Sequence, residues 1–414
     1  MGSVVVSRAL HQPGVQDGRS GVAVATYAAE KTGDPARQAI SAITRADGTL
    51  QMAVEIDSIQ SQSNRVEEAL LRLRNERRIR FPKVEVEIAR DRNVPLVLDQ
   101  LQIPHRIAGA ELRNSTFSTK HPYKPEPLTD IRTDLSYLLT WSIQSLVLGC
   151  WNSMQAPMWK LPRIWEARVM GYAPATEHEV FTVQPSNGKQ TNVQAVNQFY
   201  RGVQKTDRLL NAAQVKVDKL TDKERAAYKL LGQLPPVSPS STPPKGDDRL
   251  SVYVLGDIPN GVKPSNRFNF ISVEQRIYVS LSSIDRFCFP DQDGGPSGRN
   301  EAGREMVRAL CDLFTAILLA EPLDYRSGCQ LAPVPGTTRE IRIDNEGNET
   351  SFSIPENFLD RAIIRWHAAL DAGEKKGLIP QSGTFEATSN LQRAVAIAGK
   401  HIVGDSDGST VAES

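Results

Sequence analysis

The sequence predicts an α+β fold in which strands and helices are mixed along the chain. A strand pattern at residues 49–56 runs directly into a helix pattern at 57–78, and a second strand pattern follows at 83–89. Residues 301–321 carry the wide apolar stripe of a long amphipathic helix. No series of strand–helix repeats occurs, so a doubly wound parallel sheet is not expected.

The composition limits the class of protein. A chain of 414 residues with 40% hydrophobic residues has enough material for one large domain or two smaller ones. Lys plus Arg number 49 and Asp plus Glu number 48, so any site for a polyanion has to be local. The four cysteines lack CxxC spacing, and the longest apolar run is too short to cross a bilayer. We expect a soluble, cytoplasmic protein with reduced thiols and neither a metal nor another cofactor.

The first half of the chain divides into three segments. Residues 1–47 are predicted to be a loose lead-in with room for one strand. Residues 48–183 form the first part of the main domain, with a helix pattern at 130–146 and strand patterns at 163–174 and 177–184. Residues 184–248 combine a charged helix with a Pro/Ser-rich linker and offer little apolar material, which indicates an insertion.

The second half of the chain completes the main domain. Residues 249–403 contain strand patterns, the long helix, a hairpin at 339–354 and a final helix at 355–372. Residues 404–414 are acidic and poor in apolar side chains, so we expect them to be disordered.

The helix at 57–78 has two different halves. Its rear half is an ordinary amphipathic helix, whereas its front half is mostly Ser, Gln and Asn. Asp57 and Gln60 fit a capping box. The predicted buried stripe consists of Ile59, Val66, Leu70 and Leu73. Gln62, Asn64 and Arg65 fall off this stripe, and uncharged donors beside a helix N-terminus suit ribose and phosphate.

Signatures of common enzymes are absent from the sequence. It contains no P-loop, GxSxG elbow, HExxH motif or GxGxxG motif in the required context, and its six histidines lack metal spacing. His105 stands beside Arg106, where it suits a general base, stacking on a nucleobase or capping of a backbone carbonyl. Glu67 and Glu68 are expected on a solvated helix face.

Polar and cationic side chains recur in turn-like contexts with few acidic neighbours. This mixture suits a phosphate and ribose track, although any single Arg of this kind is more often a surface ion-pair partner. The candidate residues are Gln60, Gln62, Asn64, Arg65, His105, Arg106, Arg113, Ser115, Arg163, Arg326 and Ser327.

Three groups of motifs carry a resemblance to a known family. They are VEIDSIQSQSNRVEEAL at 54–70, PHRIAGAELRNS at 104–115 with LVLGCWNS at 146–153, and SLSSIDRFCFP at 280–290 with YRSGCQLAP at 325–333. In this order and spacing the chain resembles the backbone subunit of the subtype I-G (formerly I-U) CRISPR effector complex, or Cascade. That family is counted among the Cas family seven proteins of the RAMP superfamily. The resemblance implies a modified RRM-like (ferredoxin-like) palm with inserted finger and thumb segments, and we place the thumb in 116–129 or in 184–248.

The resemblance also implies a function. Copies of the chain would polymerise head to tail along the spacer of a CRISPR RNA and present the guide for recognition of target DNA in antiviral defence. The implied partners are CRISPR RNA, the target DNA strand through the guide, further copies of the chain, end-capping or RNA-processing and large subunits, and a recruited helicase-nuclease. Because cleavage belongs to that nuclease, we expect no catalysis here.

Two other functions stay open. One is a metal-independent endoribonuclease that processes precursor CRISPR RNA, with His105 and either Tyr123 or Lys120 as acid and base. The other is a structural assembly protein that does not touch RNA.

Overall fold

The structure is a computed structural model. It describes residues 2–11, 22, 24–25, 39–44, 48, 50–88, 96–122, 134–152, 159–174, 184–186, 189–191, 221, 270–321, 323–325 and 329–395.

The largest sheet is antiparallel, and the N-terminal strand lies in its interior. The strand order is β12-β13-β1-β11-β8-β3-β2, and β14 also pairs with β1 while β15 pairs with β14. The strands are β1 (Ser3–His11), β2 (Ile40–Thr44), β3 (Leu50–Asp57), β8 (Trp165–Pro174), β11 (Ser272–Ser280), β12 (Leu323–Tyr325), β13 (Cys329–Pro333), β14 (Arg339–Ile343) and β15 (Glu349–Ser353).

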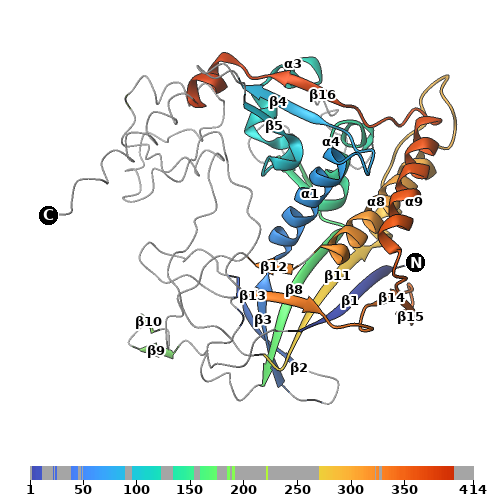
Figure 1. The fold of residues 1–414 in the computed structure, drawn as a ribbon. Helices are drawn as coiled ribbons and strands as arrows, with labels where there is room; N and C mark the ends of the chain where they lie inside the picture. The colour runs from blue at the N-terminus through green and yellow to red at the C-terminus, as the bar shows by residue number, and fades with distance from the viewer. Residues whose placement is uncertain are drawn as a thin grey trace.

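The order β13-β1-β11-β8 is the βαββαβ arrangement of a ferredoxin-like fold. Helix α1 (Ile59–Asn75) lies between β1 and β8 in the chain, and helix α8 (Arg299–Ala320) lies between β11 and β13. Both helices pack on one side of the sheet (Figure 1). The β2–β3 hairpin is inserted between β1 and α1 and extends the sheet past β8. The predicted RRM-like α+β class is confirmed.

Strand β1 differs from the expected loose lead-in. The described residues of 1–47 contain two strands, β1 and β2, and β1 pairs along its length with β11. On its helix-facing side, Arg8 is buried between Val6 and Leu10. A charged residue at this position interrupts the apolar alternation, so the sequence pattern understates the strand.

The main core lies between the sheet and its two helices. Val66 and Leu70 of α1, Trp165 of β8 and Phe314 of α8 are fully buried together. The Trp165 indole N–H donates to Thr315 Oγ1 over 3.0 Å, which satisfies its polar atom inside the core. A smaller apolar cluster lies at the other end of the same sheet face and includes Met52 and Val54 of β3.

Elements between α1 and β8, together with β16 from the C-terminal part of the chain, form a second unit above the main sheet. A small sheet has the order β16-β4-β5, and in Figure 1 it lies at the top, beyond the C-terminal end of α1. A short ribbon of β6 and β7 leads from α4 back to β8. The elements are β4 (Val84–Ile88), β5 (Leu96–Asp99), η1 (Gln100–Gln102), η2 (Arg106–Ala108), α2 (Ala110–Arg113), α3 (Thr116–Lys120), α4 (Ser136–Leu148), β6 (Cys150–Asn152), β7 (Trp159–Leu161) and β16 (Gly383–Glu386).

The C-terminal part supports the main domain from the outside. Helix α9 (Phe358–Glu374) packs on α8, and α7 (Leu281–Ile284) follows β11 directly. The hairpin predicted over 339–354 is present as β14–β15 and turns at Asp344–Asn348, with Gly347 at a φ of +87°. Within the part of the chain that the structure describes, no helix has the length and apolarity needed to cross a membrane.

Several predictions fall largely outside the described residues. In the proposed insertion 184–248, the structure describes only β9 (Gln184–Ser186), β10 (Lys189–Thr191) and residue 221. Of the strand pattern at 177–184, only residue 184 is described. The tail at 404–414 lies outside the described residues. Both candidate thumb segments lie largely outside the described residues. In 116–129, only α3 and the two residues after it are described, so the location of the thumb stays a prediction.

Candidate nucleic-acid interface

The N-terminus of α1 is capped differently from the sequence prediction. Ser58 is the N-cap, and its hydroxyl accepts from the Ser61 backbone N–H over 3.2 Å. The expected capping box of Asp57 and Gln60 is therefore wrong. Asp57 turns inward instead and is fully buried, while Gln60 is exposed.

Asp57 belongs to a buried chain of polar side chains, which we call the Asp57 network: Arg8, Asp57, Gln62, Arg65 and Gln275. Arg8 Nε donates to Gln275 Oε1 over 2.6 Å, and Gln275 Nε2 donates to Gln62 Oε1 over 2.7 Å. The Gln62 amide donates to Asp57 Oδ2, which also accepts from Arg65 Nε over 2.9 Å. The network joins β1, β11, α1 and β3.

The network also reaches the C-terminal end of α8. Arg8 Nη1 donates to the Leu319 carbonyl over 2.8 Å. A cation at a helix C-terminus satisfies carbonyls without partners and opposes the negative end of the helix dipole. Burial raises the pKa of Asp57, while the positive charge of Arg65 and hydrogen bonds from Ser61, Gln62 and Arg65 work against the rise.

This arrangement corrects the interpretation of the front half of α1. Gln62 has no exposed surface, so the expectation that it falls off the buried face is wrong. Both ends of its amide are engaged inside the protein, by Asp57 and Gln275. The Arg65 side chain is 10% exposed and pairs with Asp57. Gln62 and Arg65 therefore fix α1 on the sheet, which explains the polar residues at these two positions.

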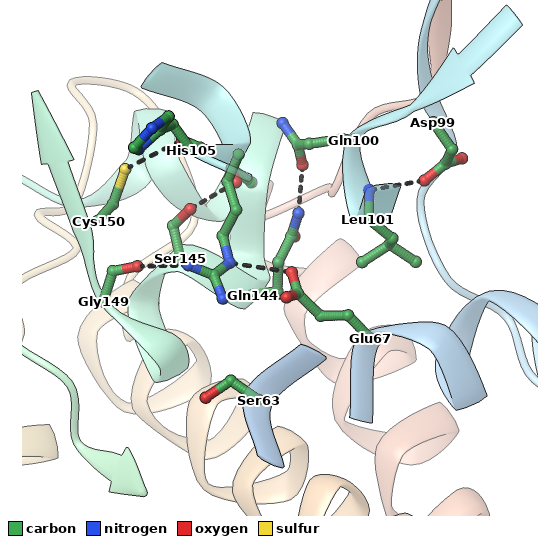
Figure 2. Close-up of polar contacts among 12 residues, drawn as sticks. Ser63, Glu67, Asp99, Gln100, Leu101, His105, Gln144, Ser145, Gly149 and Cys150 are labelled. Carbon is green, nitrogen blue, oxygen red and sulfur yellow. Dashed lines mark hydrogen bonds and ion pairs between the residues drawn. The ribbon is translucent and has the colours of Figure 1, made fainter. Parts of the chain in front are cut away.

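Arg106 is the centre of a second polar group, toward the middle of α1. Its guanidinium binds Glu67 in a bidentate way, with Nε to Oε1 at 2.9 Å and Nη2 to Oε2 at 3.0 Å. Arg106 Nη1 donates to the Gly149 carbonyl over 3.2 Å. Figure 2 shows Glu67 reaching from α1 toward this carbonyl. Glu67 is fully buried, so its predicted place on a solvated face is wrong.

Arg163 lies beside Arg106, so two positively charged side chains are neighbours here. A Cβ added at Gly149 would meet Arg163 Cγ at 3.0 Å, so the Arg163 side chain passes directly over Gly149, whose carbonyl holds Arg106. Loss of hydration lowers the pKa of the Arg163 guanidinium, and the positive charge of Arg106 lowers it further, against the opposing charge of Glu166. No described carboxylate forms an ion pair with Arg163, and the residue is exposed. Of these two adjacent cations, only Arg106 binds the buried Glu67 carboxylate.

The other predicted residues of this region serve different purposes. His105 is exposed, and its backbone carbonyl accepts from the Cys150 thiol over 3.9 Å. Burial raises the pKa of Cys150, so its thiol stays neutral. Burial lowers the pKa of Arg113, which the charge of Glu111 opposes.

Ser115 corrects the sequence prediction again. It is fully buried, its hydroxyl accepts from the Phe117 backbone N–H over 3.2 Å to cap α3, and it donates to the Leu112 carbonyl over 2.8 Å. A hydroxyl engaged in this way is a structural cap, and its burial removes it from a surface track.

Five of the predicted residues share one region, which we call the polar strip: Gln60, Asn64, His105, Arg106 and Arg163. Gln60, Asn64 and Glu67 stand at i, i+4 and i+7, so they lie on one face of α1. Along this face they are exposed, half-buried and buried in turn, and the last contacts Arg106. The strip therefore rises from α1 to the start of β6.

Arg326 and Ser327 lie outside the described residues. Within the described ranges, no group of three or more His, Cys, Asp or Glu side chains is placed to hold a metal ion.

Comparison with known families bears on the same part of the chain. Residues 16–175 match the family described as CRISPR-associated protein GSU0053 (Cas_GSU0053). Over these residues the chain resembles a CRISPR-associated family. The matched range is less than half of the 414 residues, and it contains α1, the whole polar strip and β8 up to its last residue. No curated protein matches the chain.

Three residues of structural or functional interest were not found from the sequence. Arg8 and Gln275 complete the Asp57 network from strands far away in the chain, and no local pattern joins them to α1. Trp151 lies beside the polar strip with 61% of its surface exposed. Its position in GCWNS, two residues after a turn glycine, was the available signal.

Proposed function

We propose that the chain is a CRISPR RNA-binding backbone subunit of a type I-G effector complex. In this role, copies polymerise along the spacer part of the guide and present it to target DNA. The guide has an arbitrary sequence, so the subunit holds it by phosphate and ribose and leaves sequence recognition to base pairing. The proposed partners are CRISPR RNA, neighbouring copies of the chain, and the other subunits of the complex.

The observation that carries this proposal is the match of residues 16–175 to a CRISPR-associated family, together with the polar strip inside that range. Arg163 is exposed beside Arg106. The two guanidinium groups together carry more positive charge than the one carboxylate that Arg106 binds can balance. An excess of guanidinium charge next to exposed His105 suits a phosphate with its ribose. The ferredoxin-like sheet supplies the palm that the proposal needs.

The direct test is salt-dependent binding of single-stranded RNA by the purified chain. We expect the logarithm of the association constant to fall linearly with the logarithm of the salt concentration. Arg163→Ala removes one exposed cation and is expected to reduce the slope by about 0.7 for a single strand. Arg361, an exposed arginine on α9, provides the matched control as Arg361→Ala. Absence of RNA binding by the wild-type chain at low salt would reject the proposal.

We propose further that the chain does not cleave RNA. The competing endoribonuclease uses His105, which is exposed and stands next to Arg106. Of its suggested partners, Lys120 is an exposed residue at the end of α3, and Tyr123 lies outside the described residues. Incubation with labelled repeat RNA separates the two functions: specific cleavage that disappears in His105→Ala would establish the enzyme.

A further inference from the structure

The ribbon of β6 and β7 has one face in the core and one in solvent. Cys150 pairs with Leu161, and both are buried, with 8% and 2% of their surface exposed. Trp151 pairs with Lys160 on the opposite face, because successive side chains of a strand alternate. Trp151 is 61% exposed, and Lys160 is exposed as well. The buried face fixes the ribbon, so the indole is presented on an anchored support.

The environment of the indole is cationic. Lys160 Nζ lies 5.5 Å from the centroid of the Trp151 ring, within cation–π range. Gly149, two residues before Trp151, holds Arg106 through its carbonyl and lies beneath Arg163. A large exposed aromatic side chain therefore stands at the end of the polar strip, with arginine and lysine on the same short segment.

We propose that Trp151 is a stacking platform for one base of a single-stranded RNA, whose neighbouring phosphates contact Lys160 and Arg163. This inference rests on the RNA-binding function proposed above and names a residue that the sequence analysis did not assign. Stacking of a base on an aromatic ring tolerates any sequence because every base has a π face. Cations beside the ring contact the backbone of the same nucleotides, which is the arrangement used by proteins that hold single strands without sequence preference.

An exposed Trp is also a frequent anchor of protein–protein contacts. The surrounding charge favours RNA instead. Lys160 and Arg163 are both exposed cations, and no described carboxylate forms an ion pair with either. A protein partner would have to bring acidic groups to this short ribbon, whereas RNA supplies a phosphate with every base.

The test compares Trp151→Ala with Trp151→Phe in equilibrium binding of a mixed-sequence single-stranded RNA to the full chain. Loss of one stacked base is expected to weaken binding by about 5- to 150-fold in Trp151→Ala, whereas Trp151→Phe keeps most of the affinity. The salt slope is expected to stay unchanged in Trp151→Ala, because a stacked ring neutralises no phosphate. RNA should quench less indole fluorescence in Trp151→Phe than in the wild type.

Ile364 on α9 is 68% exposed and gives the matched control, Ile364→Ala, for removal of a large exposed apolar side chain. Equal RNA affinity of Trp151→Ala and Ile364→Ala would overturn the platform. So would a Trp151→Ala variant that loses self-association but keeps its RNA affinity, because that result makes Trp151 a protein contact. If Arg163→Ala weakens binding while Trp151→Ala does not, the platform fails and the RNA-binding function stands. If the wild-type chain binds no RNA, both fail.

Discussion

Helix α1 carries two polar groups with opposite relations to solvent. In the Asp57 network, Arg8, Asp57, Gln62 and Gln275 are each no more than 3% exposed, and each one finds a partner inside the protein. In the polar strip, Gln60, His105 and Arg163 are exposed. Both groups contain Gln and Arg, and their members on α1 alternate within residues 60–65, so composition alone does not separate them.

The difference shows what each group can do. A buried polar chain whose members pair with one another specifies how α1 sits on the sheet, and its burial keeps it out of contact with a ligand in solvent. A group with more guanidinium charge than carboxylate, facing solvent, is set up for an anion. Variants in the network should therefore change stability, and variants in the strip should change binding.

The largest effect is expected from Asp57→Ala. This variant leaves Arg65 and the Gln62 amide without their shared acceptor at a buried position, and breaking a buried ion pair costs about 3 to 5 kcal/mol. Urea denaturation measures the loss in the free energy of unfolding. Glu68→Ala, at an exposed position on the same helix, is the control and should stay within about 0.5 kcal/mol of the wild type. A loss below about 1 kcal/mol in Asp57→Ala would show that the network is dispensable.

Gly149→Ala tests the junction between the strip and the ribbon. Gly149 has a φ of +76°, and an added Cβ would meet the Leu161 carbonyl oxygen at 2.9 Å. We expect a loss of about 1 to 3 kcal/mol in the free energy of unfolding from backbone strain and this contact together. Gly336→Ala shares the positive φ, at +72°, but meets no atom within 4 Å, so it isolates the strain. If both variants lose the same amount, the close contact has no energetic consequence.

A smaller effect is expected from the titration of Asp57, which makes the stability of the folded chain depend on pH. Because burial raises the pKa of Asp57 above its ordinary value of 3.8, the folded chain holds this proton more tightly than the unfolded chain. The resulting stabilisation is complete below pH 3.8 and is lost as the pH rises through the folded-state pKa. Asp57→Asn does not titrate, so the stability of the wild type relative to this variant should fall as the pH rises. Urea denaturation of both proteins, from below pH 3.8 upward, measures this difference in stability. A rise with pH instead of a fall would contradict the burial argument.

The smallest expected effect is that of Arg163→Ala on RNA affinity. Loss of one exposed phosphate contact should weaken binding by about fivefold, or about 1 kcal/mol. The free energy of unfolding should stay within about 0.5 kcal/mol of the wild type, since the side chain forms no described ion pair. RNA titrations and urea denaturation on the same preparation measure both quantities. A variant that loses stability but keeps its RNA affinity would remove Arg163 from the interface.

Much of the fold follows from local sequence patterns. The periodicity of 57–78, 130–146 and 301–321 predicts α1, α4 and α8, and each is present with shifted ends. The hairpin at 339–354 and the final helix are also present. The small parallel pair of β16 and β4 was not predicted, because its two strands are short and far apart in the chain.

The candidate site was predictable only in part, because burial of polar residues depends on partners from distant segments. Gln62 looks like a surface residue until Gln275 and Arg8 are known to lie against it. Glu67 looks solvated until Arg106, 39 positions away, covers it. The sequence marks Arg106 and Arg163 as candidate cations, but their proximity is set by Gly149, which no pattern in either stretch indicates.

The central claim, that this chain holds guide RNA as a repeating subunit, is tested most directly by its co-expression with a CRISPR RNA. The purified chain should carry RNA whose nuclease-protected length increases in proportion to the number of protein copies. Light scattering measures the number of copies in each complex. A chain that purifies free of RNA and binds none when it is added, at any salt concentration, would contradict the claim.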